Sequence, residues 1–257
     1  MPENVLTAFL LTVFAGLSTG IGSAIAYLIK KPKTKYLSFS LGFSAGVMIY
    51  ISFMELLSGS FKTIGEGWGL ISFFFGITCI GLIDIAIPES ENPHDFKEPA
   101  DIEENPPDPD LVRTGLFTAL AIGIHNFPEG LATFGAALSD VKLGAIVAIA
   151  IAIHNIPEGI SVSVPLFYAT HDRRKAFCYS FLSGMAEPVG ALIGFLILLP
   201  FLTPNVLAGL LAFVAGIMVY ISLDELLPMA HRYGHSHTVI SGILLGMLIM
   251  ALSLLML

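Results

Sequence analysis

Long runs of apolar residues, each about as long as a bilayer-spanning helix, fill most of this chain. Eight such runs can be distinguished, at residues 5–29, 36–58, 67–88, 111–138, 143–168, 175–200, 204–227 and 238–257. A helix needs roughly 20 mostly apolar residues to cross the hydrocarbon core of a membrane. The pattern therefore predicts an all-α integral membrane protein with eight transmembrane helices, folded as a single transmembrane domain over residues 1–257.

Composition supports the membrane class. The chain has 257 residues, of which 55% are hydrophobic and 12% are charged. Soluble domains carry about 25% charged residues, so this chain has about half the usual share. We expect the lipid bilayer as its environment, and no nucleic acid as a partner.

Lysine and arginine positions predict the orientation, because cytoplasmic connections are enriched in these residues. With eight spans, alternate connections lie on opposite sides of the membrane. Ten of the twelve basic residues fall on one side and only Lys62 and Lys142 on the other. This asymmetry places both termini outside the cytoplasm. The long connection at residues 89–110 is then a cytoplasmic loop, which is rich in Pro and holds nine of the twenty acidic residues.

Parts of the sequence repeat. LGFSAGVMIYISFMELL, from Leu41, and LAFVAGIMVYISLDELL, from Leu211, are identical at 11 of 17 positions. A weaker match links AGLSTGIGSAIAYLI, from Ala15, to SGMAEPVGALIGFLI, from Ser183. Predicted spans 1, 2 and 3 thus correspond to 6, 7 and 8, the last pair by elimination, and span 4 corresponds to span 5. Partners lie an odd number of spans apart and cross in opposite directions, which indicates an inverted repeat with a substrate site near the midplane.

Spans 4 and 5 each carry the same polar segment inside an apolar run, HNFPEG at residues 125–130 and HNIPEG at residues 154–159. In each copy the His and the Glu are four positions apart and share one helix face, with the Asn within reach. A charged side chain at the bilayer centre costs at least about 2.5–3.5 kcal/mol. These helices contain no Lys or Arg beside the carboxylates, so a bound cation is the expected partner. We therefore predict metal ligands at His125, Asn126, Glu129, His154, Asn155 and Glu158.

Other residues extend this picture. Pro128 and Pro157 remove helical hydrogen bonds, and Gly130 and Gly159 permit a close helix approach. Glu187 in span 6 is a further predicted ligand. Nearer the ends of the spans, the carboxylates are predicted to be pathway-rim or interfacial groups rather than core ligands: Asp84, Glu55, Asp224 and Glu225. Three histidines precede span 8, where a solvated polar turn is favoured over capture of metal at the exit: His231, His235 and His237.

The ligand types limit which cations the predicted site would bind. Imidazole suits zinc, iron, nickel or copper, while carboxylate and amide oxygens suit harder ions. A site with imidazole, carboxylate and amide ligands and no thiolate favours a borderline divalent metal. Its affinity would be moderate, so that the metal can be released.

With its eight helices, long connection between spans 3 and 4 and paired HNxPEG motifs, the whole chain resembles the ZIP metal-ion transporters, especially the bacterial ZupT-type importers. The resemblance implies import of Zn²⁺, and possible transport of Fe²⁺, Mn²⁺ or Cd²⁺, across a prokaryotic inner membrane, with no organic cofactor. It implies a binuclear centre, with His125, Glu129, His154 and Glu158 at one site, Asn126, Asn155 and Glu187 at the other, and Glu129 and Glu158 bridging. It also implies an elevator motion of spans 1, 4, 5 and 6 against the rest, and a homodimer.

The alternative class is an intramembrane metalloenzyme, either a hydrolase or a di-iron oxidase. The chain has no HExxH motif of a zinc protease, and no apolar span contains the ExxH of di-iron bundles. The HxxxE order, the prolines and the repeat favour a transporter over an enzyme.

Overall fold

The computed structural model describes residues 4–28, 34–86, 109–170, 172–198, 201, 203–232 and 235–256. These residues form helices and no strand, so the all-α class is confirmed. The elements, with π-helical segments labelled η, are α1 (Val5–Leu28), α2 (Thr34–Ile51), η1 (Ser52–Leu57), α3 (Ser58–Ala86), α4 (Pro109–Ser139), α5 (Val141–Thr170), α6 (Arg173–Gly184), α7 (Ala186–Ile193), η3 (Gly194–Leu198), α8 (Pro204–Ile221), η5 (Ser222–Leu226), α9 (Leu227–Arg232) and α10 (Ser236–Met256).

Six helical stretches in the described part of the chain are long and apolar enough to cross a membrane. One of them, residues 38–85, covers two predicted spans, because α2, η1 and α3 follow one another without a gap. Gly65 interrupts this stretch with φ +79° and ψ 160°, a backbone conformation that glycine adopts without a Cβ clash. The remaining difference is α4, which is not among these six stretches.

The predicted loop at residues 89–110 lies outside the described residues, apart from Pro109 and Asp110, where α4 begins. That helix therefore starts two residues earlier than the pattern predicted.

Local chemistry explains several helix boundaries. Asp172 caps α6 by accepting hydrogen bonds from the backbone N–H groups of Arg174 at 2.9 Å and Lys175 at 3.1 Å. Thr203 caps α8 in the same way, with Pro204 at the first helical position. The boundary between α6 and α7 falls at Met185, and Pro188 has no N–H to donate to the carbonyl of Gly184 four positions earlier.

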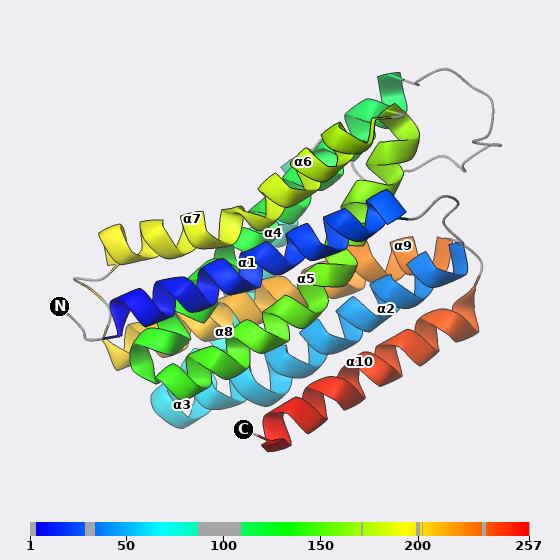
Figure 1. The fold of residues 1–257 in the computed structure, drawn as a ribbon. Coiled ribbons are helices and arrows are strands. Elements are labelled where there is room, and N and C mark those ends of the chain that lie inside the picture. The colour runs from blue at the N-terminus through cyan, green and yellow to red at the C-terminus, as the bar shows by residue number, and fades with distance from the viewer. Residues whose placement is uncertain are drawn as a thin grey trace.

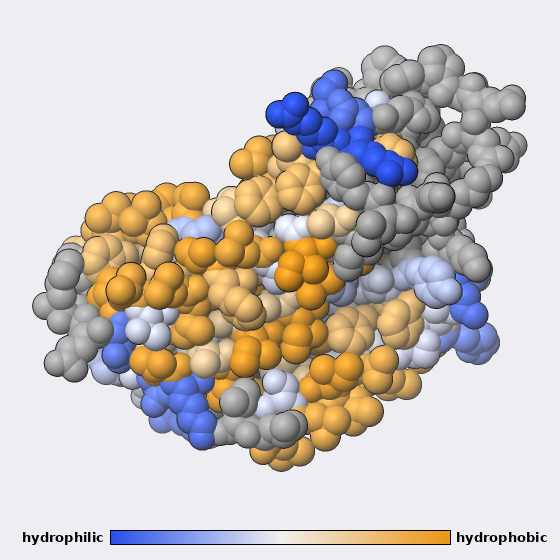
Figure 2. Space-filling model, in the orientation of Figure 1, coloured by the Kyte–Doolittle hydropathy of each residue, from blue (hydrophilic) through white to orange (hydrophobic). Residues whose placement is uncertain are grey.

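The helices form one bundle whose axes run in roughly the same direction (Figure 1). Helix α1 packs against α5, α4 against α5 and α7, α2 against α10, and α3 against α8. On the face shown in Figure 2, hydrophobic residues cover the middle and hydrophilic residues gather toward the ends of the helices. Many large apolar side chains are exposed, including Leu255 at 82% and Ile85 at 79%. This distribution is typical of a multi-pass membrane protein.

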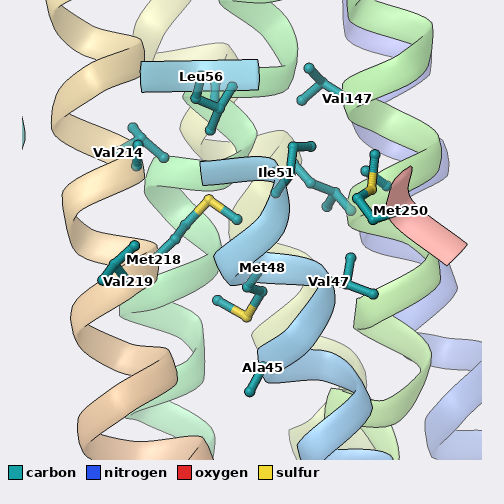
Figure 3. Packing of buried hydrophobic residues seen from close by; sticks show 14 of the residues in the cluster. Ala45, Val47, Met48, Ile51, Leu56, Val147, Val214, Met218, Val219 and Met250 are labelled. Atoms are coloured by element: carbon teal, nitrogen blue, oxygen red, sulfur yellow. The ribbon is translucent and has the colours of Figure 1, made fainter. Parts of the chain in front are cut away.

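The main core joins α2, α5 and α8. Met48 and Ile51 of α2 lie among side chains that include Met218 of α8 and Val147 of α5, and all four are buried (Figure 3). Alanines fill much of the remaining core, so the helix backbones approach closely.

Glycines produce the tightest contacts between α2 and α10 and between α3 and α8. A Cβ atom on any of these glycines would overlap a backbone carbonyl oxygen of the facing helix. The pairs are Gly46 with Ile243, Gly246 with Phe43, Gly76 with Phe213, and Gly216 with Phe73. These contacts repeat with an offset of 170 positions. The contact of Gly46 with Ile243 becomes that of Gly216 with Phe73, and the other two pairs are related in the same way.

We expect Gly216→Ala to lower the free energy of unfolding by about 1–3 kcal/mol, because the added methyl group would force α8 away from α3. Chemical unfolding of the detergent-solubilised protein measures this change. Gly59→Ala is the control, since a Cβ atom there meets nothing within 4 Å. Equal stabilities for the two variants would contradict the packing described here.

Candidate metal-binding site

The two polar segments lie within α4 and α5, and Glu187 lies in the first turn of α7. Six of the seven predicted ligands have side chains that the structure describes. Each of these six is at most 1% exposed: Asn126, Glu129, His154, Asn155, Glu158 and Glu187. His125 belongs to α4, and its side chain lies outside the described part of the structure.

His154 lies between two carboxylates. Its Nε2 atom is 3.2 Å from both Oε1 and Oε2 of Glu129 on the neighbouring helix α4. The same Nε2 atom is 4.0 Å from Oε1 of Glu158, one turn further along α5. The structure thus brings three of the predicted ligands together, from both copies of the motif.

The asparagines connect this cluster to α1, α6 and α7. Asn155 Nδ2 donates to Oε1 of Glu187 and also, at 3.0 Å, to the backbone carbonyl of Ala15 in α1. Asn126 Nδ2 donates to the backbone carbonyl of Ser183 in α6 at 3.2 Å. Glu187 is therefore joined to the motif on α5 through Asn155.

The glycine that ends each motif explains how these helices come so close. A Cβ atom on Gly130 would overlap the carbonyl oxygen of Glu187, and a Cβ atom on Gly159 would overlap that of Thr19. The predicted close approach at both glycines is confirmed. In α4, Gly130 directly follows Glu129. The backbone of Glu187 therefore lies against the residue next to Glu129.

The prolines lie inside continuous helices. Pro128 is within α4 and Pro157 within α5, and both helices continue beyond them. Neither proline therefore ends its helix, although each lacks the N–H of an intrahelical hydrogen bond.

Charge balance is the main electrostatic feature of the site. Glu129, Glu158 and Glu187 are buried, and the buried residues in the described part of the chain include no Lys or Arg. Several kilocalories per mole are lost when an ionised carboxylate leaves water without compensation. His154 and the amide of Asn155 supply part of that compensation, and a cation with two positive charges would supply more.

Within the described side chains, no group of three or more His, Cys, Asp and Glu residues has the arrangement of a metal site. The imidazole and the carboxylates are instead hydrogen-bonded to one another or to an asparagine. The chemistry of the donors, with imidazole nitrogen and carboxylate and amide oxygens, still suits a borderline divalent cation.

The other predicted residues lie outside α4, α5 and α7. Asp84 accepts a hydrogen bond from the hydroxyl of Tyr220 at 3.3 Å, which joins α3 to α8. The remaining six are placed by burial: Glu55, Asp224 and His235 are half-buried, Glu225 is 8% exposed, and His231 and His237 are exposed. Glu55 lies in η1, and Asp224 and Glu225 lie in η5.

Sequence reasoning missed a network of serines beside the site. Ser180 of α6 donates to the carbonyl of Gly159 at 2.9 Å, and its Oγ lies 2.6 Å from Oγ of Ser23 in α1. Ser163 donates to the same carbonyl of Gly159 at 2.5 Å. The only signal in the sequence was the presence of serines in apolar runs, which does not identify their partners.

Comparison with known proteins gives a consistent result. A family model described as "ZIP Zinc transporter" matches residues 86–254. The chain is 57% identical to "Zinc transporter ZupT" of Chlorobium phaeovibrioides, with 99% of each protein aligned. It is 55% identical to the protein of that name from Oceanobacillus iheyensis, again over 99% of each. The Clostridium perfringens relative, also named "Zinc transporter ZupT", is 54% identical over 99% of this chain and 97% of its own length.

Ser180→Ala should lower the free energy of unfolding by about 1–2 kcal/mol, because it removes a buried hydroxyl that links α1, α5 and α6. Denaturant titration in mixed micelles would measure the change. Ser241→Ala, which removes an exposed serine hydroxyl from α10, serves as the matched control. The network contributes nothing to stability if both variants unfold at the wild-type midpoint.

Proposed function

Because this chain belongs to the ZIP family of zinc transporters, we propose that it imports Zn²⁺ into the cytoplasm along the helices that carry the HNxPEG motifs. It is a multi-pass membrane protein and a transporter rather than an enzyme. The intramembrane metalloenzyme considered above is therefore not favoured. The observation that carries the proposal is the cluster of Glu129, His154 and Glu158, buried between α4 and α5.

The proposed metal centre is binuclear. One ion is bound by His125, Glu129, His154 and Glu158, which is supported by the distances of 3.2 Å and 4.0 Å from His154 Nε2 to the two carboxylates. The second ion uses the amide oxygens of the two asparagines together with Glu187, and the hydrogen bond between Asn155 and Glu187 supports that grouping. Glu129 and Glu158 bridge the ions in this proposal, because each contacts His154 and lies three positions after the asparagine of its own motif.

We extend the proposal to eight spans in an inverted repeat, with both termini outside the cytoplasm. Contacts among the helices support the repeat. The α2–α10 and α3–α8 glycine contacts match residue by residue. The helices that carry or adjoin the motifs show the same relation. Gly22 of α1 packs against the carbonyl of Ile156 in α5, and Gly190 of α7 packs against the carbonyl of Phe127 in α4. The π-helical segments η1 and η5 also occupy equivalent positions in the matching sequences.

An elevator-type motion would move α1, α4, α5, α6 and α7 against α2, α3, α8 and α10. Contacts within each group are extensive, namely α1 with α5, α4 with α7, α2 with α10, and α3 with α8. The core cluster that joins the two groups is apolar, with Ala132 and Val147 from one group and Ile51 and Met218 from the other. Such surfaces slide without breaking polar contacts.

Further parts of the proposal concern selectivity and setting. The borderline ligand set would also accept Fe²⁺, Mn²⁺ or Cd²⁺. The similar bacterial proteins and the asymmetry of basic residues favour the cytoplasmic membrane of a bacterium. The homodimer rests on the family resemblance. The pathway roles of residues such as Asp84 and Glu225 rest on their positions near the ends of the predicted spans.

Glu129→Ala and Glu158→Ala should each abolish zinc uptake, because each carboxylate is proposed to contact both ions. Uptake of radioactive zinc into liposomes containing the purified protein measures this loss. Glu66→Ala removes the same charge at an exposed position beside the Gly65 break and should transport normally. Wild-type flux in either site variant would remove the central role assigned to these carboxylates.

Zinc affinity should fall at least about tenfold between pH about 7.5 and about 5.5, because the histidine ligands must be neutral to bind metal. A competition titration with a fluorescent zinc chelator across this range measures the affinity, with the chelator calibrated at each pH. An affinity that stays constant over the range would argue against histidine as a ligand.

A further inference from the structure

The two motif asparagines make the same unusual contact with the backbone of two different helices. Asn126 Nδ2 donates to the carbonyl of Ser183 in α6 at 3.2 Å, and Asn155 Nδ2 donates to the carbonyl of Ala15 in α1 at 3.0 Å. Ala15 and Ser183 are the first residues of the two matching sequences AGLSTGIG and SGMAEPVG. The contact is therefore duplicated along with the motif.

These contacts determine the orientation of each side-chain amide. A backbone carbonyl only accepts hydrogen bonds, so the amide atom that faces it must be the NH₂ group. The amide oxygen is then directed away from the carbonyl. Both oxygens, Oδ1 of Asn126 and Oδ1 of Asn155, are buried, and no donor in the described part of the chain reaches either one. A buried acceptor without a donor destabilises the fold, and a cation at the oxygen would offset that loss.

The positions of the two carbonyls depend on a close crossing of α1 and α6. Each accepting residue is followed directly by a glycine, Gly16 and Gly184. A Cβ atom on Gly16 would lie 2.6 Å from the carbonyl oxygen of Gly184, and one on Gly184 would lie 2.7 Å from that of Gly16. Ser183 is also next to the end of α6, which falls at Gly184.

We propose that the backbone carbonyls of Ala15 and Ser183 act as positioning groups for the metal site, because they hold the two asparagine amides with their oxygens available to the cation. This inference rests on the proposed function and adds outer groups that support the proposed ligands. Helix α1, which supplies no ligand side chain, thereby takes part in metal binding. Outer-shell partners of this kind typically change metal affinity by about 10–100-fold when they are lost.

The inference makes aspartate a poor replacement for asparagine. If the side chain were only a ligand, a carboxylate would bind the cation at least as well as an amide. In the proposed arrangement, Asn126→Asp replaces the NH₂ group with an oxygen that faces the carbonyl of Ser183. The two acceptors repel each other, and the side chain rotates away from the ligating orientation.

The test compares the full-length wild type, Asn126→Asp and Asn126→Ala. Equilibrium dialysis in detergent gives the number and affinity of zinc ions per chain, and liposome uptake gives KM and the maximal rate. We expect Asn126→Asp to lose at least about tenfold in affinity at one of the two ions and to raise KM, as Asn126→Ala does. Zinc binding by Asn126→Asp as tight as that of the wild type, or tighter, would overturn the inference.

A second test shifts the carbonyl of Ser183 without altering a proposed ligand, and it uses one variant and one control. Gly184→Ala places a methyl group 2.5 Å from Cβ of Thr19 and should shift the Ser183–Gly184 peptide, which raises KM about tenfold. Gly20→Ala, one turn further along α1, meets only the ring edge of Phe181 at 2.8 Å, which can rotate away. A wild-type KM for Gly184→Ala would contradict the inference, and the aspartate variant decides the question if Gly184→Ala does not fold.

Failure of this inference can be distinguished from failure of the proposed function. If the wild type neither binds nor transports zinc, the proposed function itself is wrong. If the wild type transports zinc and Asn126→Asp matches it, only the positioning role of the carbonyls is wrong.

Discussion

Three carboxylates buried inside a helical membrane protein impose the constraint on which the rest of the site depends. Glu129, Glu158 and Glu187 are each at most 1% exposed, and they come from three different helices. Negative charge at such depth has to be compensated. His154 contacts two of the carboxylates and Asn155 contacts the third. A divalent cation would complete the compensation, and this links the stability of the helix bundle to its cargo.

Close helix packing is what brings these groups together. Gly130 lets the backbone of α7 approach at Glu187, and Gly159 lets α1 approach at Thr19. Each of these glycines directly follows a motif glutamate, so one short segment supplies both a carboxylate and the space for a facing helix. The same segment supplies an asparagine that holds the backbone of α1 or α6. The HNxPEG motif therefore combines the proposed metal ligands with the glycine that allows close packing, and the two roles together account for its residues better than either role alone.

Much of the architecture could be predicted because hydropathy and residue type carry that information directly. The apolar runs predicted membrane helices, and the doubled motif predicted the family and the pairing of Glu129 with residues of α5. The sequence could not predict partners that are backbone atoms, such as the carbonyls of Ala15 and Ser183, because every residue has a carbonyl. The π-helical turns at η1 and η5 were equally hidden, since their residues fit an ordinary helix. The Ser180 network depends on the distance between helices, which no periodicity encodes.

The central claim is that buried imidazole and carboxylate groups bind the transported zinc. Zinc-edge X-ray absorption on the zinc-loaded protein tests this claim most directly. The account predicts a first shell of nitrogen and oxygen at about 2.0–2.2 Å, with the multiple-scattering signal of histidine and no sulfur. It also predicts that the histidine signal weakens in His154→Ala. A spectrum of fully hydrated zinc, or one with sulfur ligands, would contradict the account.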